Sequence, residues 1–261
     1  MLFQDINGIQ FFQFDIYRSY PLVQGIFTRH GGVSPDPWSS LNVGGTLGDD
    51  PDRVQENHKR VFASTGRALE TLYDVWQVHS ATVVHACEPR GEASLQQADI
   101  LISATPEITL FMRFADCVPI FLYDPRKHAI GMVHAGWLGT VRHAVETAVQ
   151  AMTQQFGSES GDILAGIGPS IGPDHYEVGE DVRAQVSSSF GPKGDDFFVT
   201  RNGKMYLDLW SANRYLLEEQ GVSQIEMAGI CTACMNDDWF SHRAEKGSTG
   251  RFGALLSLES L

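Results

Sequence analysis

Three side chains of metal-ligand type stand in three separate motifs of the sequence. His79 ends the motif Trp-Gln-Val-His, Cys117 ends Ala-Asp-Cys, and His134 begins His-Ala-Gly-Trp. Each follows a run of apolar residues typical of a core strand, and binding groups are usually held at strand ends and in the loops after them. Two imidazoles and one thiolate suit zinc, and three protein ligands leave a fourth position for water or substrate. We therefore expect a catalytic metal centre whose ligands are His79, Cys117 and His134.

Each of these residues, taken alone, also has a simpler interpretation. His79 would be a hydrogen-bonded surface residue, Cys117 an inert core thiol, and His134 an incidental residue in a glycine-containing turn. The spacing is too long to form a local motif, so the centre depends on strands that share one sheet system. Asp116 argues against the inert thiol, because a buried carboxylate beside Cys117 needs a partner or a cation.

A Cys-x-x-Cys pair, Cys231 and Cys234, is a second candidate for metal or redox chemistry. A structural zinc site needs two further ligands, and no second pair stands nearby in the sequence. A thioredoxin-like site needs a βαβ context, which is also absent. We therefore expect a tight turn with two partly buried thiols and no second metal site.

Polar loops supply candidates for substrate binding. Arg29, Arg243 and Arg251 lie in or beside glycine-containing loops, and Asn42 lies in a similar loop. A guanidinium binds phosphate through two parallel hydrogen bonds, and nearby backbone N–H groups add donors. The alternative is that these loop arginines are solvated and bind nothing. We take Arg29, Asn42 and Arg243 as candidates for phosphate and ribose.

Several familiar catalytic motifs are missing from the sequence. There is no Walker GxxxxGK[ST] loop, and the glycines at 166 and 168 do not complete a GxGxxG dinucleotide fingerprint. The HExxH motif of metalloproteases and the GxSxG nucleophile elbow are absent. The HxE…PCxxC signature of nucleobase deaminases is absent as well.

Composition excludes some partners. The chain has 261 residues, 43% of them hydrophobic, and a formal net charge of −13. This balance predicts a globular protein with a real core and argues against nucleic acid and anionic membranes as partners. A small anion remains possible as a ligand, because a few arginines can reverse the field inside one pocket. Oligomeric state is left open between a monomer and a small homo-oligomer.

The expected compartment is the cytoplasm. The first residues, MLFQDINGIQFFQF, lack the basic start, apolar run and small-residue cleavage site of a signal peptide. No stretch reaches the roughly 18 to 20 apolar residues that span a bilayer. Four cysteines are too few for a disulfide scaffold in a chain of this length, which favours a reducing compartment.

The elements that must position these residues follow from the apolar pattern. Predicted strands cover 24–28, 73–78, 82–86, 99–103, 108–114, 118–123 and 129–133. Predicted helices begin at Asp50-Pro51, as an N-cap followed by proline, and cover about 140–156, 180–190 and 209–220. Strands clustered in the middle without a strict βαβ rhythm indicate an α+β protein with mixed sheets. One domain over 1–261 is the simplest organisation.

The motifs, in their order along the chain, resemble those of the laccase-domain family once called DUF152, the YfiH/YlmD-like proteins. The matching segments are TRHGGVS at 28–34, SLNVG at 40–44, QVHS at 77–80, ADILIS at 98–103, ADCVPI at 115–120, VHAGW at 133–137, IGPSIG at 167–172, HYEVG at 175–179, CTAC at 231–234 and FSHR at 240–243. They run over nearly the whole chain, so the resemblance is specific.

This resemblance implies a single four-layered α/β/β/α domain, related to YfiH-like cysteine hydrolases. It implies zinc, with copper as the alternative, held by His79, Cys117 and His134, and adds Gln77 of the QVH motif to the substrate-binding candidates. It implies phosphorolysis of adenosine, inosine and methylthioadenosine, together with adenosine deamination. Two departures stand out: Leu138 replaces the arginine of the usual HAGWRG, and Phe114 replaces the threonine before ADC.

Three functions compete at this point. The first is a zinc-dependent purine nucleoside enzyme acting on a nucleoside and phosphate. The second is a copper-dependent polyphenol oxidase; known multicopper sites need HxH pairs, and the nine histidines here form none. The third is a cysteine hydrolase or peptidoglycan editing factor with Cys117 as nucleophile and a histidine as its base. Metal content separates the third from the first, because a metal-bound thiolate is poorly available as a nucleophile.

Overall fold

Two mixed sheets of six strands each form the centre of the computed structural model, which describes residues 2–261. The first sheet has the order β1 (Leu2–Ile6), β2 (Ile9–Gln13), β3 (Leu22–Phe27), β14 (Phe252–Leu258), β7 (Thr109–Phe114), β4 (Leu72–Tyr73). The second has the order β13 (Gln224–Met227), β10 (Leu164–Ile167), β8 (Val118–Asp124), β9 (Ala129–Ala135), β6 (Ile100–Ser103), β5 (Val83–His85). Most neighbours are antiparallel, but β4 with β7, β5 with β6, and β10 with β13 are parallel.

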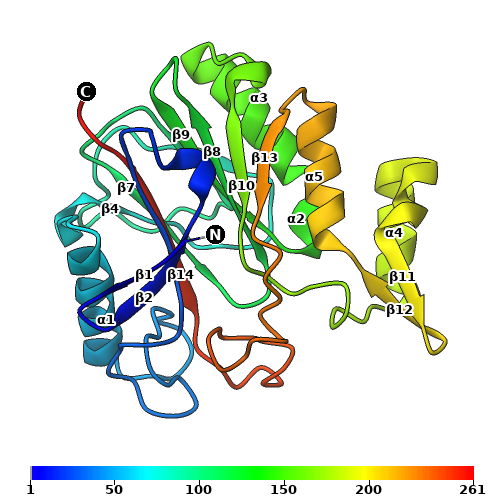
Figure 1. Ribbon diagram of the computed structural model, residues 1–261, viewed down its shortest axis with the longest axis horizontal. Helices are drawn as coiled ribbons and strands as arrows, with labels where there is room; N and C mark the ends of the chain where they lie inside the picture. Colours follow the sequence, from blue (N-terminus) through cyan, green and yellow to red (C-terminus); the bar gives the residue numbers. More distant parts are fainter. Residues whose placement is uncertain (1) are drawn as a thin grey trace.

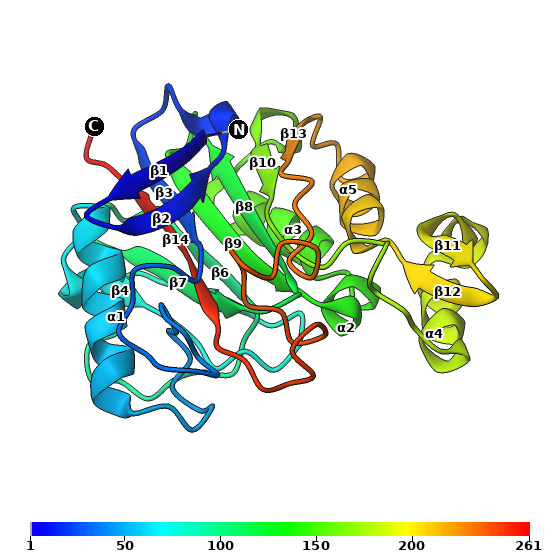
Figure 2. The ribbon, with the colours of Figure 1, turned by 60° about the horizontal axis from the view of Figure 1, so that its bottom comes forward.

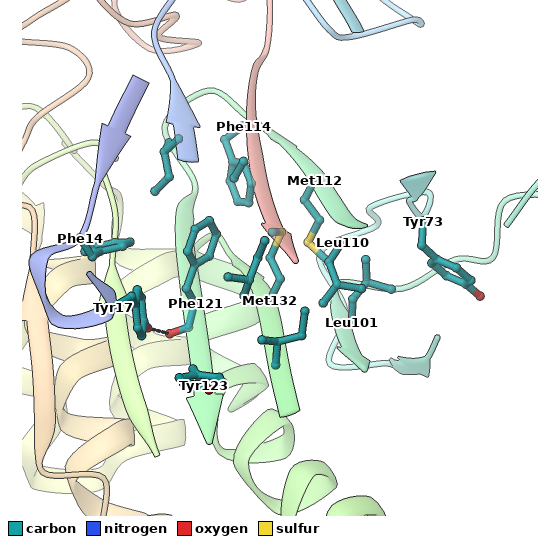
Figure 3. Close-up of a cluster of buried hydrophobic side chains, with 14 of the residues drawn as sticks. Phe14, Tyr17, Tyr73, Leu101, Leu110, Met112, Phe114, Phe121, Tyr123 and Met132 are labelled. Atoms are coloured by element: carbon teal, nitrogen blue, oxygen red, sulfur yellow. Dashed lines mark hydrogen bonds between the residues drawn. The ribbon is translucent and has the colours of Figure 1, made fainter. Parts of the chain in front are cut away.

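The two sheets pack face to face through large apolar side chains (Figure 3). Met112 and Phe114 of β7 meet Phe121 of β8 and Met132 of β9 in one buried cluster. The Tyr17 hydroxyl, buried in the same layer, donates a hydrogen bond of 2.8 Å to the Phe121 carbonyl. Strands buried on both faces read as continuous apolar runs, which is why β7, β8 and β9 were predictable from the sequence.

Helices cover the outer faces of both sheets (Figures 1 and 2). α1 (Pro51–Ser64) packs Val61 and Phe62 on the first sheet. α3 (Ala144–Phe156) and α5 (Leu209–Glu219) cover the second, and the short α2 (Trp137–Val141) precedes them. α4 (Glu180–Phe190) lies to the side with the hairpin of β11 (Phe198–Arg201) and β12 (Lys204–Leu207). The expected four-layered α/β/β/α arrangement with mixed sheets is therefore confirmed.

Several local predictions are confirmed and three are corrected. Asp50 caps α1 by accepting a hydrogen bond of 2.9 Å from the Asp52 N–H. The helix expected over 140–156 is instead two helices, α2 and α3, broken at His143, whose φ of 57° is left-handed. The strand expected over 73–78 ends at Tyr73, because the chain then turns toward the site. The sequence analysis did not predict seven of the strands, which are β1, β2 and β10 to β14.

The strands that precede or carry the three metal-ligand candidates belong to two sheets and not to one. β4 and β7 are in the first sheet, whereas β8 and β9 are in the second. Cys117 lies in the short turn by which the chain crosses from β7 to β8. The site is therefore built where the two layers meet. Among residues 2–261, no helix combines the length and apolar character needed to cross a membrane.

Candidate metal centre

His79, Cys117 and His134 come together in space. Sγ of Cys117 lies 3.8 Å from Nε2 of His79, and the rings of His79 and His134 have their centroids 5.0 Å apart. One ligand atom from each of the three residues lies within 4.8 Å of the other two. His134 is buried, Cys117 is half-buried and His79 is exposed, so the cluster opens to solvent on one side.

Local backbone geometry produces this approach. His134 in β9 is paired with Pro119 in β8, which places Cys117 beside the chain just beyond the end of β9. A Cβ on Gly136 would lie 2.7 Å from Sγ of Cys117, so only glycine allows the backbone to pass this close. His79 and Asp116 both have left-handed backbones, with φ of 58° and 84°. These turns direct the side chains of neighbouring residues toward one point.

Asp99 holds both histidine segments from behind. One carboxylate oxygen lies 2.8 Å from Nδ1 of His134. The other accepts hydrogen bonds from the backbone N–H groups of Val78 and Ser80, at 3.1 and 2.6 Å, on either side of His79. Asp99 is fully buried. A carboxylate bound to the far nitrogen of a histidine fixes its tautomer and leaves the other nitrogen, here Nε2, free for a metal.

Asp116, next to Cys117, is satisfied by the protein itself. Its carboxylate accepts hydrogen bonds from the hydroxyls of Thr232 and Ser241 at 2.8 and 2.7 Å, and from the Arg243 N–H at 2.6 Å. The partner expected for this buried carboxylate is thus a set of donors and not a cation. Asp116 ties the Cys117 turn to the segments that carry Thr232 and Arg243.

The electrostatics of the cluster favour charge separation. Burial opposes both charged forms, but the nearby histidines lower the pKa of Cys117 to about 6. Burial also opposes a charged His134, yet the Cys117 thiolate and the hydrogen bond to Asp99 raise its pKa to about 9. The thiolate is the form of Cys117 that binds metal, whereas His134 must release its proton to become a ligand.

This donor set fits zinc. Two imidazole nitrogens and one thiolate are ligands that zinc prefers, and a histidine held by a carboxylate is the usual outer arrangement of such sites. With three protein ligands, the fourth coordination position would face the opening. The arrangement therefore resembles a catalytic site more than a closed structural one.

The cluster lies in a cavity of about 620 Å³. This volume falls within the range of pockets that bind small ligands. Trp76, Leu95 and Tyr176 contribute apolar or aromatic wall, and Trp76 is 53% exposed. An exposed tryptophan at the mouth of a pocket offers a flat face on which an aromatic ring can stack.

Arginines line the same cavity. Arg113, Arg243 and Arg251 are all part of its wall. Arg113 forms an ion pair with Asp74, so its charge is compensated. Arg243 and Arg251 donate to backbone carbonyls, and neither forms an ion pair with any residue from 2 to 261. These two guanidinium groups are uncompensated in the sense that no carboxylate of residues 2–261 lies within ion-pair distance, although Asp116 and Glu245 act on Arg251 from farther away.

The structure places two of the expected substrate-binding residues elsewhere. Arg29 does not line the cavity: it donates to the Ser39 and Asn236 carbonyls, both at 2.8 Å, and forms an ion pair with Glu245 at 3.1 Å. Asn42 is fully buried, and its amide oxygen accepts the N–H groups of Gly44 and Arg251, both at 2.9 Å. Both residues stabilise loops around the cavity, because their polar groups are already used by the protein.

Gln77 and Arg243, in contrast, lie at the cavity. The Gln77 side chain exchanges two hydrogen bonds with the Arg113 backbone, its amide donating at 2.8 Å and its oxygen accepting at 2.9 Å. β4 pairs with β7 only through Leu72 and Tyr73. Beyond that point the two side-chain hydrogen bonds of Gln77 take the place of backbone pairing and hold the His79 segment against β7. Gln77 is therefore a positioning residue in this structure.

Leu138 also lines the cavity, at the position where the motif departs from HAGWRG. Arg142, one helical turn later, directs its guanidinium to the His79 carbonyl and is not part of the cavity wall. It does not supply the missing positive charge at Leu138. Its contact supports the loop that presents His79.

Sequence reasoning missed Asp99 and Arg113 as parts of the site, and it named Arg251 among the loop arginines without selecting it. Asp99 had a detectable signal, since a carboxylate at the start of the apolar strand 99–103 needs a buried partner. Arg113 had a similar one, because it interrupts an apolar strand. Arg251 had no signal to separate it from other loop arginines.

Comparisons with known proteins agree over most of the chain. A family model described as multi-copper polyphenol oxidoreductase laccase matches residues 23–259. A purine nucleoside phosphorylase of Deinococcus radiodurans is 39% identical over 232 residues, which cover 88% of this chain and 87% of that protein. Purine nucleoside phosphorylase YfiH of Escherichia coli is 34% identical, covering 88% of this chain and 91% of that protein. The crystal structure of YlmD from Geobacillus stearothermophilus is 31% identical with a TM-score of 0.92, covering 98% of both chains.

Proposed function

The chain belongs to the multi-copper polyphenol oxidoreductase laccase family, as its motifs indicated, and on this premise we propose that it is a zinc-dependent purine nucleoside phosphorylase. Relatives that are 39% and 34% identical carry the name purine nucleoside phosphorylase. The observation that carries the proposal is one cavity in which the His79–Cys117–His134 cluster and two uncompensated arginines face the same space.

In phosphorolysis, an oxygen of phosphate forms a bond to C1′ of the ribose while the bond from C1′ to the purine nitrogen breaks. The electron pair leaves with the purine, which takes up a proton. Arg251 and Arg243 would hold the phosphate, because a charge-assisted contact to a dianion is strongest where no carboxylate competes. Trp76 would stack on the purine at the cavity mouth.

His79, Cys117 and His134 would hold the zinc ion. When bound, zinc supplies a Lewis acid and lowers the pKa of a coordinated water to about 7. Asp99 keeps the His134 ring oriented, and Gln77 keeps the His79 segment against β7. These residues position the metal ligands.

Adenosine deamination is a second proposed activity of the same cavity. The open side of the metal cluster favours it, because the reaction needs an activated water near the base: the water oxygen bonds to the purine C6, the bond from C6 to the amino nitrogen breaks, and ammonia leaves. Deamination needs no phosphate. The two activities therefore differ in their dependence on Arg251 and on the phosphate concentration.

The test uses the full chain purified without chelator and loaded with zinc. Inosine is incubated with and without phosphate, and free hypoxanthine and ribose 1-phosphate are quantified; adenosine is assayed separately for inosine. We expect base release to require phosphate and to be lost in Cys117→Ser, which removes a metal ligand. Cys87→Ser, at an exposed thiol outside the cavity, is the matched control. If the rate of base release does not depend on phosphate, or if Cys117→Ser still releases the base, the proposal is wrong.

The same samples test the alternatives. A copper-dependent polyphenol oxidase would gain phenol oxidation when copper replaces zinc, in proportion to copper at the His79–Cys117–His134 cluster. A cysteine hydrolase or peptidoglycan editing factor would be most active without metal, since the Cys117 thiolate, whose pKa is lowered to about 6, is then free to attack. Loss of activity on metal removal argues against the hydrolase.

A further inference from the structure

A second cluster of metal-ligand side chains lies outside the centre described above. Asp174 and His175 come from the loop after β10, and Cys231 and Cys234 from the loop after β13. The sequence alone argued against a site at Cys231 and Cys234, since no further ligands stand near them in the chain. The fold supplies these ligands from a segment more than fifty residues earlier.

Sheet topology explains the meeting. β10 and β13 are parallel neighbours, with Leu164 opposite Gln224, so their following loops leave the same edge of the sheet (Figure 1). An isolated bridge between Ser170 and Cys231 extends this pairing beyond the strands. The approach of the two loops thus follows from strand order and does not depend on surface side chains.

The two distances from His175 to the cysteine sulfurs match tetrahedral coordination, and the two distances to Asp174 Oδ2 are shorter, at hydrogen-bond length. Sγ of Cys234 lies 3.4 Å from Nδ1 of His175 and 2.8 Å from Oδ2 of Asp174. Nδ1 of His175 lies 3.8 Å from Sγ of Cys231 and 3.1 Å from Oδ2 of Asp174. All four ligand atoms lie within 4.8 Å of one another. Ligands at zinc bond lengths of roughly 2.0 to 2.3 Å stand roughly 3.3 to 3.8 Å apart around a tetrahedron.

The backbone also contacts one sulfur of the cluster. The Gly172 N–H donates to Sγ of Cys231 at 3.2 Å, and Cys231 is buried. A Cβ on Gly172 would lie 2.6 Å from Asp174 Oδ1 and 3.2 Å from the Cys231 Cβ, so the glycine lets the two loops close on one another.

We propose that Asp174, His175, Cys231 and Cys234 form a second zinc site, structural in type. Four protein ligands close the coordination sphere, in contrast to the three ligands and open side of the His79–Cys117–His134 centre. Two thiolates and one imidazole select a borderline-soft ion such as zinc over magnesium or calcium, which prefer oxygen.

A metal at this position would fix two walls of the cavity. Tyr176, which lines the cavity, directly follows the ligand His175. Thr232, between the two cysteines, donates at 2.8 Å to Asp116, the neighbour of Cys117. The second zinc therefore joins the loop that carries Tyr176 to the turn that positions Cys117.

Zinc content of the full chain tests the proposal. Protein produced with zinc and purified without chelator is analysed for metal per chain. We expect two zinc ions in the native protein, one in Cys234→Ser, one in Cys117→Ser and none in the double variant. Cys87→Ser, whose exposed thiol belongs to neither cluster, is the matched control and keeps two. A zinc content in Cys234→Ser equal to that of the native protein, or no zinc in Cys117→Ser, overturns the proposal.

Cobalt keeps the proposal testable if Cys234→Ser does not fold. In Cys117→Ser, Co²⁺ should produce thiolate-to-metal absorption and intense bands of tetrahedral cobalt, which His175→Asn weakens. Counting free thiols and measuring the intact mass show whether Cys231 and Cys234 have instead formed a disulfide. A disulfide between Cys231 and Cys234 in freshly purified protein, or no thiolate absorption with Co²⁺, contradicts a metal site. Neither readout depends on nucleoside turnover, so the result stands apart from the proposed phosphorylase activity.

Discussion

The carboxylate of Asp99 lies 2.8 Å from Nδ1 of His134 and is fully buried with it at the base of the metal centre. Its second oxygen holds the loop around His79 through the N–H groups of Val78 and Ser80. One carboxylate thus positions two of the three proposed ligands. This double role explains why an acid stands directly before the apolar strand β6.

Asp99→Asn should weaken zinc binding at this centre by roughly ten- to a hundredfold, the usual cost of losing a carboxylate behind a ligating histidine. The asparagine also places an amide N–H₂ group, which cannot accept a hydrogen bond, against either His134 Nδ1 or the N–H groups of Val78 and Ser80. Zinc affinity is measured by competition with a chromophoric chelator. Asp124→Asn is the matched control, since Asp124 is equally buried at the end of β8 and belongs to neither ligand cluster. Equal affinities in the two variants would refute the role given to Asp99.

Arg251→Met should raise the KM for phosphate by roughly ten- to a hundredfold. The variant loses a charge-assisted contact worth roughly 1.5 to 3 kcal/mol while it keeps an unbranched side chain. Initial rates at varied phosphate and saturating inosine give this constant. Arg126→Met, at a side chain 72% exposed and paired with Asp162, is the control and should leave the KM unchanged. If the KM for phosphate is unchanged in Arg251→Met, a residue other than Arg251 binds the phosphate.

Trp76→Ala should raise the KM for the nucleoside and leave the KM for phosphate near its native value. Truncation removes an exposed aromatic face at the cavity mouth, and stacking on a base is worth about 1 to 3 kcal/mol. Trp76→Phe retains a ring and should recover most of the affinity. If the two variants behave alike, or both constants change together, the purine does not stack on Trp76.

Leu138→Arg should improve phosphate use by roughly ten- to a hundredfold, because an added guanidinium on the cavity wall offers one more charge-assisted contact. Arg142 does not take this place, since its guanidinium binds the His79 carbonyl. Phosphate dependence of adenosine and inosine turnover is compared with that of Leu138→Met. Strong, saturable phosphate dependence in the native protein, unchanged by the arginine, would make Leu138 a neutral replacement.

His58 should make the fold sensitive to acid. Burial, with the nearby Arg113 charge, lowers its pKa to about 4 from the ordinary 6.5. Between these values the unfolded chain binds the proton that the folded chain excludes, so stability falls as pH falls. The expected loss is about 2 kcal/mol between pH 7 and pH 5.

His58→Gln is the variant that isolates this effect, since glutamine cannot gain a charge and can still donate to the Val43 carbonyl that His58 contacts. Urea unfolding at pH 7 and pH 5 compares the two proteins. The native protein should lose about 2 kcal/mol more than the variant over this interval. Parallel changes in both would place the acid sensitivity elsewhere.

The sequence by itself determined the parts of this protein that depend on near neighbours. Proline after Asp50 marked the start of α1, and continuous apolar runs marked β7, β8 and β9. The motifs identified the family and singled out His79, Cys117 and His134. Such signals are local because capping, burial on both faces and turn chemistry act over a few residues.

Only the tertiary structure decided which loops meet. The sequence could not separate Arg29 from Arg251. The Arg29 guanidinium binds Glu245 and backbone carbonyls, whereas Arg251 lines the cavity. It also gave no reason to join His175 to Cys231, which the parallel pairing of β10 and β13 brings together. Strand order is settled by burial of the whole set of apolar faces, a global free energy that no short segment contains. The contacts between loops follow from that order.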